Sequence, residues 1–363
     1  MKKATSILIS MLLASIAFGK EPTPADSISK IQLCLILDVS GSMDGLLSQA
    51  QNEIWKTISF IEGFQKDDLK TVIEIAVISY GNLKYAENGH VKLVVDFTVD
   101  IDEVAEKLWT METGGGNEFC GSAIKNALDS LAWEGKAIFK CIIMAGNEPF
   151  DQGVVNFEES TLLATQKGIL LNTIYCGEKE KGMYEKWDKA AQLGNGTYAN
   201  IDQNLGIDEF KTPYDHTLVK FYYDYKSTYF DEKKEERVNR FDSKGEVSPA
   251  IRDMIIYKYG RTKKAKDIID KFNESNWEIN ELDNSEIPEI LRSLSPKELK
   301  FKLLEFSRKR EAYAEGFETY TQKVEEFLKI TVQPKLNNKT LNLAMSEMIS
   351  AQLIKFGYVK KWP

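Results

Sequence analysis

Histidine is scarce in this chain, and positive charge is outnumbered by negative charge. It has only two histidines, His90 and His216, in 363 residues, so a histidine-based catalytic triad or a histidine-rich metal site is hard to assemble. Its 47 lysines and arginines are outnumbered by 55 aspartates and glutamates, which leaves a formal net charge of −8. Nucleic-acid binding needs a basic surface that releases counterions from phosphates. The composition therefore predicts that nucleic acid is not a partner.

Long apolar runs are also absent after the N-terminal segment, so no stable membrane span is expected in the rest of the chain. At the N-terminus a positively charged start precedes an apolar run over residues 7–18, and Ala17 and Gly19 are the small residues that signal peptidase requires. We predict a signal peptide over residues 1–19 and mature protein from Lys20, exported to the periplasm or secreted. An uncleaved N-terminal anchor is the alternative.

Cysteine is rare as well, with four residues in the chain. Cys34, Cys141 and Cys176 lie in apolar, strand-like sequence, where cysteine acts as a small buried hydrophobe. Cys120 lies in a loop or at a helix start. We expect Cys34 and Cys141 to be buried and reduced. A Cys120–Cys176 disulfide stays open as an alternative, because both residues can lie at the same end of a sheet.

Short apolar runs alternate with amphipathic stretches in the first part of the chain. Most of the runs are β-branched and nearly continuous, as expected of strands buried on both faces. The alternation predicts an α/β fold with a doubly wound, mostly parallel, six-stranded sheet. Only a short connection separates the second and third runs, which are therefore expected to pair as an antiparallel hairpin at one edge. The six expected strands are residues 31–37, 72–80, 91–97, 138–144, 169–176 and 197–201.

After residue 202 strand-like runs vanish, and helical patterns rich in lysine, glutamate and aromatic residues take over. Ser295 followed by Pro296 is favourable chemistry for a helix start, and this helix is expected to be the longest. A last helix is expected to end near residue 356. The predicted organisation is a signal peptide at 1–19, an α/β domain at 30–211 and an all-helical C-terminal region at 212–363.

The most informative residues follow the first predicted strand, where Asp38, Ser40 and Ser42 form an Asp-x-Ser-x-Ser loop. The loop carries one carboxylate and two hydroxyls, which are oxygen ligands suited to a hard cation such as Mg²⁺. The carboxyl ends of the strands are also where open α/β sheets bind ligands. The alternative is a helix N-terminus capped by polar side chains, with no metal bound.

This loop, in this order of elements, resembles the metal-ion-dependent adhesion site of von Willebrand factor type A (VWA) domains. The resemblance implies a Rossmann-like fold and a divalent cation that can accept an acidic group from a partner. It also implies that a threonine from a glycine-rich second loop and an aspartate after the fourth strand complete the site. Gly116 occupies the usual threonine position, and Asn117 or Glu118 could take that role. Gly146 occupies the usual aspartate position, so a charge is missing there.

Two further segments extend the resemblance. The sequence Ala-Gly-Asn-Glu-Pro-Phe over residues 145–150, and Thr-Pro-Tyr-Asp over residues 212–215, are similar to a group of exported bacterial VWA proteins. The resemblance to this group extends over most of the mature chain. It implies no particular function.

We therefore predict a non-enzymatic, exported binding or adhesion-type protein. Its partner, a protein or an envelope-surface ligand, would be captured at a degenerate metal site or on the helical region. A scaffold without bound metal is the alternative, and a metal-dependent hydrolase is the least favoured one, because no general base or second metal is recognisable. No nucleotide is expected, since the glycine-rich loop lacks both the P-loop and the GxGxxG pattern. Weak binding of Mg²⁺, Mn²⁺ or Ca²⁺ is assigned to Asp38, Ser40, Ser42, Asn117 and Glu118.

Overall fold

The protein is described here from a computed structural model. The expected signal peptide at residues 1–19 lies outside the described residues, and no helix among those described is long and apolar enough to cross a membrane. The described residues are 28–67, 69–135, 139–204, 211–230, 249–262, 267–273, 287–331 and 340–361.

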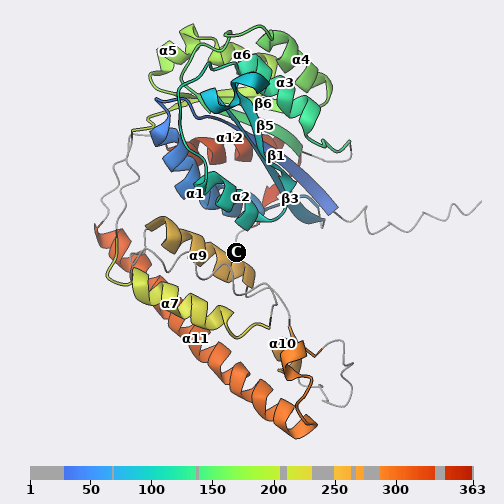
Figure 1. The fold of residues 1–363 in the computed structure, drawn as a ribbon, viewed down its shortest axis with the longest axis vertical. Helices are drawn as coiled ribbons and strands as arrows, with labels where there is room; N and C mark the ends of the chain where they lie inside the picture. Colours follow the sequence, from blue (N-terminus) through green and yellow to red (C-terminus); the bar gives the residue numbers. More distant parts are fainter. Residues whose placement is uncertain are drawn as a thin grey trace, which may run out of the picture.

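Six strands form one sheet in the order β4-β3-β1-β5-β6-β7, with β1 and β5 in the middle (Figure 1). Neighbouring strands are parallel except β3 and β4, which pair antiparallel at the edge. The predicted fold class and the predicted edge hairpin are therefore confirmed. The strands are β1 (Ile28–Asp38), β3 (Lys70–Tyr80), β4 (Val91–Thr98), β5 (Phe139–Gly146), β6 (Leu170–Cys176) and β7 (Asn195–Ile201).

Side chains that alternate along β1 separate two apolar layers. Leu33 and Leu35 belong to a cluster that includes α1 and α2, whereas Cys34 and Ile36 belong to the cluster of α3, α4 and α6 on the other face. Both faces of the central strand are therefore buried, which explains its continuous apolar sequence. The flanking helices are α1 (Asp44–Glu62), α2 (Ile101–Trp109), α3 (Cys120–Ser130), α4 (Phe157–Gln166), α5 (Lys179–Tyr184) and α6 (Trp187–Leu193).

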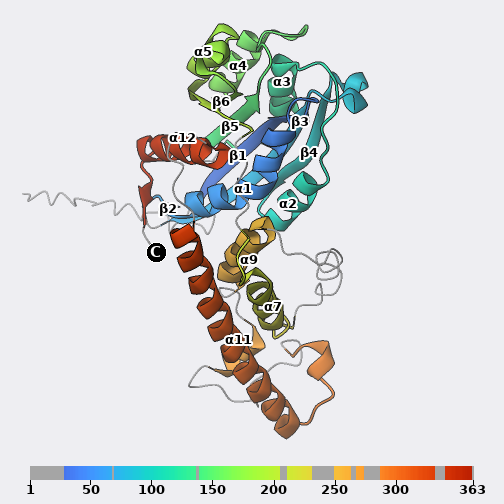
Figure 2. The same cartoon turned by 90° about the vertical axis from the view of Figure 1, so that its left-hand side faces the viewer.

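The last helix of the chain returns to this domain. Helix α12 (Leu341–Lys355) packs against α1 beside the sheet (Figures 1 and 2), and β8 (Val359–Lys360) pairs antiparallel with β2 (Phe64–Gln65). The buried amides of Asn172 on β6 and Gln352 on α12 donate to each other's oxygens at 3.0 and 2.7 Å. The residues expected as one helical region at 212–363 are thus divided. Helix α12 completes a face of the α/β domain, and the other helices of this range project away from the sheet.

The remaining helices project away from the sheet and are called the helical arm (Figure 2). Helix α7 packs against both α9 and α11. Aromatic stacking joins two of these helices, since Tyr259 of α9 lies 4.1 Å from Phe317 of α11 between ring centroids. The arm consists of α7 (Asp215–Lys226), α9 (Pro249–Thr262), α10 (Ile268–Phe272), η5 (Glu289–Leu291) and α11 (Pro296–Thr331).

A buried arginine fastens the far part of the arm. Arg310 of α11 donates from Nη1 and Nη2 to Asp267 at 2.8 and 2.7 Å. Its Nε donates to Thr228 Oγ1 at 3.0 Å, and its guanidinium lies 3.7 Å from the ring centroid of Tyr229. One side chain therefore joins α11 to the start of α10 and to the segment after α7.

All four cysteines are buried and free. Cys34 and Cys141 are both fully buried in strands, as predicted. Cys120, at the start of α3, and Cys176, at the end of β6, belong to the apolar clusters on opposite faces of the sheet. The alternative of a disulfide between them is therefore not formed.

Candidate functional site

The Asp-x-Ser-x-Ser loop lies at the carboxyl end of the central strand, between the ends of β3 and β5. The Asp38 side chain is fully buried, and its Oδ1 accepts a hydrogen bond from the Ser40 amide at 2.8 Å. Its Oδ2 has no hydrogen-bond partner among the described residues. A buried carboxylate oxygen without a partner is costly, so this atom is the strongest sign of a ligand-binding role in the loop.

Negative charge is crowded around Asp38. Burial, with smaller contributions from the carboxylates of Glu118 and Glu148, raises the pKa of Asp38 to about 7, against the opposing hydrogen bonds from Ser40. Burial, together with Glu148, also raises the pKa of Glu118. These carboxylates disfavour each other's ionised form, so a bound cation would relieve their repulsion.

Hydroxyl and amide groups from two loops border the carboxylate. The Oγ atoms of Ser40 and Ser42 lie 3.5 Å apart, and Ser42 Oγ lies 3.3 Å from Asn147 Nδ2. Within the described part of the chain, no three His, Cys, Asp or Glu side chains gather closely enough to hold a metal. Any cation here would therefore depend on the serine hydroxyls as well as on Asp38.

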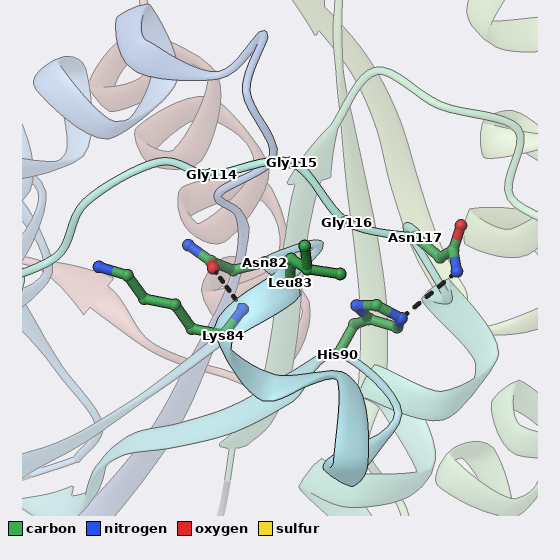
Figure 3. A pocket seen from close by; sticks show the side chains of 8 residues that line it. All are labelled: Asn82, Leu83, Lys84, His90, Gly114, Gly115, Gly116 and Asn117. Carbon is green, nitrogen blue, oxygen red and sulfur yellow. Dashed lines mark hydrogen bonds between the residues drawn. The ribbon is translucent and has the colours of Figure 1, made fainter.

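The structure brings most, but not all, of the predicted site residues together. Asp38, Ser40 and Ser42 share one loop, and Glu118 interacts with both Asp38 and Ser40. Asn117 instead points its Nδ2 at the Nε2 of His90, 3.3 Å away (Figure 3).

Sequence reasoning left two neighbouring residues out of the predicted set. Asn147 contacts Ser42, and Glu148 acts electrostatically on Asp38. The available signal was their position directly after β5, the strand that pairs with β1.

Gly146 occupies the position at which the resemblance predicts an aspartate, and the fold leaves no room for one. A Cβ at this position would lie 2.3 Å from Tyr80 Oη and 2.9 Å from Asp38 Oδ2. Tyr80, on β3, is itself fully buried. The tyrosine hydroxyl therefore occupies the space next to Gly146 that a side chain would need.

Gly116, at the usual threonine position, is closed in the same way. A Cβ there would lie 2.5 Å from the carbonyl oxygen of Gly81 and 2.8 Å from the carbonyl carbon of Asn82. Backbone atoms of this kind cannot move aside easily, so the glycine-rich loop packs directly on the Gly81–Asn82 backbone. Both departures from the family pattern are thus built into the packing of this chain.

A cavity of about 640 Å³ is lined in part by the glycine-rich loop (Figure 3). We call it the His90 cavity. It is formed between this loop and η2 (Leu83–Asn88), which connects β3 to β4. Its lining residues are Asn82, Leu83, Lys84, His90, Gly114, Gly115, Gly116 and Asn117.

The strand order, the single antiparallel edge strand and the Asp-x-Ser-x-Ser loop after the central strand give residues 28–201 the VWA-type fold that the sequence predicts. No protein-family model and no curated protein matches the sequence.

Several solved structures are similar to the chain. BatB from Bacteroides thetaiotaomicron is 17% identical with a TM-score of 0.36, over 47% of this chain and 90% of that one. An aerotolerance-related membrane protein from Bacteroides fragilis is 15% identical with a TM-score of 0.35, over 47% and 92% of the two chains. The VWA domain of SpRpn10 is 13% identical with a TM-score of 0.36, over 47% and 87%.

Proposed function

We propose that this protein is an exported, non-enzymatic binding protein that captures a protein or envelope-surface ligand through a weakly held divalent cation. The observation that carries the proposal is the buried Asp38 carboxylate, whose Oδ2 has no hydrogen-bond partner among the described residues and which lies in the same loop as the hydroxyls of Ser40 and Ser42. Mg²⁺, Mn²⁺ or Ca²⁺ suits such oxygen donors. When bound, the cation would supply a positively charged acceptor for an acidic group of the partner.

The donor set explains why the cation would be held weakly. Asp38 is the single carboxylate of the loop. The packing around Gly146 leaves no space for a second carboxylate at that position. Glu118 is placed to assist, because it already interacts with Asp38 and Ser40. Asn117 could contribute only through its Oδ1, because its Nδ2 is engaged with His90.

Binding is favoured over catalysis because of how the carboxylates are arranged. The described loops bring Asp38, Glu118 and Glu148 near each other, and we recognise no nucleophile with an adjacent base among them. Non-covalent capture needs no such pair.

Thermal unfolding with added divalent cation tests the metal site. At concentrations 10- to 100-fold above the dissociation constant, Mg²⁺ or Mn²⁺ should stabilise the wild-type protein by about 1–3 kcal/mol. The Asp38→Ala variant should lose this stabilisation, whereas Asp129→Ala, which removes an exposed carboxylate on α3, should keep it. An unchanged melting temperature in millimolar Mg²⁺, Mn²⁺ and Ca²⁺ would favour the capped loop without metal. Equal shifts in wild type and Asp38→Ala would place the cation elsewhere.

A second candidate places partner binding on the helical arm. Three large apolar side chains near its far end are exposed: Ile290 (76%), Phe301 (70%) and Leu304 (39%). Such surface is typical of protein-binding sites. Affinity capture from the native envelope fraction, with and without EDTA, separates the two candidates. Capture that persists in EDTA and is lost in a Phe301→Ser, Leu304→Ser variant would favour the arm.

A further inference from the structure

We propose that the His90 cavity binds a small, singly charged carboxylate ligand without help from a metal. The cavity is distinct from the Asp38 loop, because Asp38, Ser40 and Ser42 are not among its lining residues. Its lining combines a histidine, a lysine, backbone amides and one apolar side chain. The proposal therefore concerns a second site, beyond the proposed cation site.

His90 provides the central observation. Its side chain lines the cavity while the residue is only 7% exposed, and its Nδ1 has no hydrogen-bond partner among the described residues. The Nε2 atom faces Asn117 Nδ2 at 3.3 Å. Because an amide NH₂ can only donate, Nε2 accepts and the ring proton resides on Nδ1. The edge-to-face contact with Phe119, at 5.5 Å between ring centroids, fixes the ring in this orientation.

Other hydrogen-bond donors border the same space. In the described structure the amide N–H groups of Gly115 and Gly116, two of the lining residues, have no backbone acceptor. The Lys84 ammonium pairs with Glu112 at 2.8 Å, but both side chains are more than 60% exposed. Exposed ion pairs of this kind are weak, so Lys84 can exchange Glu112 for a ligand. The donors are held in place because the Leu83 amide donates to the Gly115 carbonyl at 2.7 Å.

This set of groups selects the class of ligand. Donors predominate, and backbone N–H groups beside a lysine favour an anion. Glu112 pairs with Lys84, and Glu118 interacts electrostatically with His90, so a doubly charged anion such as phosphate meets more repulsion than a carboxylate. Leu83 is 65% exposed and offers an apolar wall. A carboxylate on a short apolar body fits both features.

Nitrogen NMR of the protein labelled with ¹⁵N-histidine tests the proposal directly. The chain has only two histidines, and His216 on α7 is exposed and remote from the cavity, so it serves as an internal control. In EDTA, butyrate should shift the His90 ring signals in a saturable way and leave His216 unchanged. Butyrate should bind more tightly than acetate, and both more tightly than phosphate or sulfate.

Variants then assign the binding to the cavity. Lys84→Gln should weaken butyrate binding at least fivefold, whereas Lys92→Gln, which removes a nearby lysine outside the lining, should not. Leu83→Ser should remove the preference for butyrate over acetate. Asp38→Ala should bind butyrate as the wild type does, which keeps this result independent of the cation site.

Four results would overturn the proposal. These are no saturable shift at His90, equal shifts at both histidines, a shift that requires added Mg²⁺, and tighter binding of phosphate than of carboxylate. The third would assign the anion to a bound metal and so support the cation site instead. The fourth would show that the cavity binds anions but prefers phosphate to a carboxylate.

Discussion

Asp38 is a buried acid whose charge changes in the neutral range, because burial raises its pKa to about 7. An unfolded aspartate titrates near 3.9, so between these values the folded state binds more protons than the unfolded state. The free energy of unfolding should therefore fall as pH rises through this window, by up to about 4 kcal/mol in total. Asp38→Asn should lack this slope.

Denaturant unfolding from pH 4.5 to 8 measures the difference between wild type and Asp38→Asn. Added Mg²⁺ should recover stability in the wild type mainly above pH 7, where Asp38 is ionised and able to bind a cation. Parallel stability curves for the two proteins would show that Asp38 titrates normally.

Gly146 gives a second prediction at the scale of one residue. Gly146→Ala places a methyl group against Tyr80 Oη and Asp38 Oδ2, and overpacking of this kind costs about 1–3 kcal/mol. Gly115→Ala is the matched control, because no heavy atom lies within 4 Å of its added Cβ. It should change stability by less than about 0.5 kcal/mol. Equal effects in urea unfolding would contradict the packing argument.

Among the elements, the helical arm depends on one buried arginine. Arg310→Ala leaves Asp267 without its partner and removes the link between α10, α11 and the segment after α7. Breaking a buried pair from one side costs about 3–5 kcal/mol.

The control is Lys309→Ala, next along α11, which removes a half-exposed pair with Glu305 and a cation–π contact with Phe306 and should cost about 1 kcal/mol or less. Urea unfolding followed by tyrosine fluorescence compares the two variants. A small loss for Arg310→Ala would mean that packing alone holds the arm.

The elements themselves were largely predictable. The strands were predictable because most of them are nearly continuous apolar runs, and helix α11 begins at Pro296, as the Ser295–Pro296 pair predicts. The helical segment between β6 and β7 is divided into two helices, α5 and α6. The break falls at Lys186, which adopts a left-handed backbone conformation (φ 70°). Nothing in the local sequence marks that conformation.

The surroundings of the site were less predictable, because they depend on contacts between distant residues. The motif identified Asp38, Ser40 and Ser42 directly. Tyr80 fills the space beside Gly146, and this follows only from the pairing of β3 with β1. Asn117 faces His90 because of the turn at Gly89 and His90, where both residues have positive φ. Neither relation has a periodic signal in the sequence.

On the scale of the whole molecule, α12 makes the α/β domain depend on the end of the chain. A chain that stops at residue 339 should bind a hydrophobic dye and lose cooperative unfolding, whereas a chain that lacks only the last two residues should not. Each large apolar side chain that loses its burial forfeits about 1.5–3 kcal/mol, and several together exceed the usual stability of a domain. The buried apolar residues of α12 are Leu341, Ala344, Met345, Met348, Ile349 and Leu353.

Adding the peptide 340–361 to the shortened chain should restore cooperative unfolding, as measured by circular dichroism. Full stability without the peptide would show that α12 is dispensable to the domain.

The hydrogen bond between Ser29 and Tyr358 joins residues 329 positions apart. Contacts between such distant residues slow folding, because a long stretch of chain must be ordered before they form. During synthesis β1 emerges long before α12, the helix that covers part of its sheet. The α/β domain therefore completes its folding only after the whole helical arm has been made. Until then one side of the sheet remains uncovered, and the growing chain stays open to chaperones and to proteases.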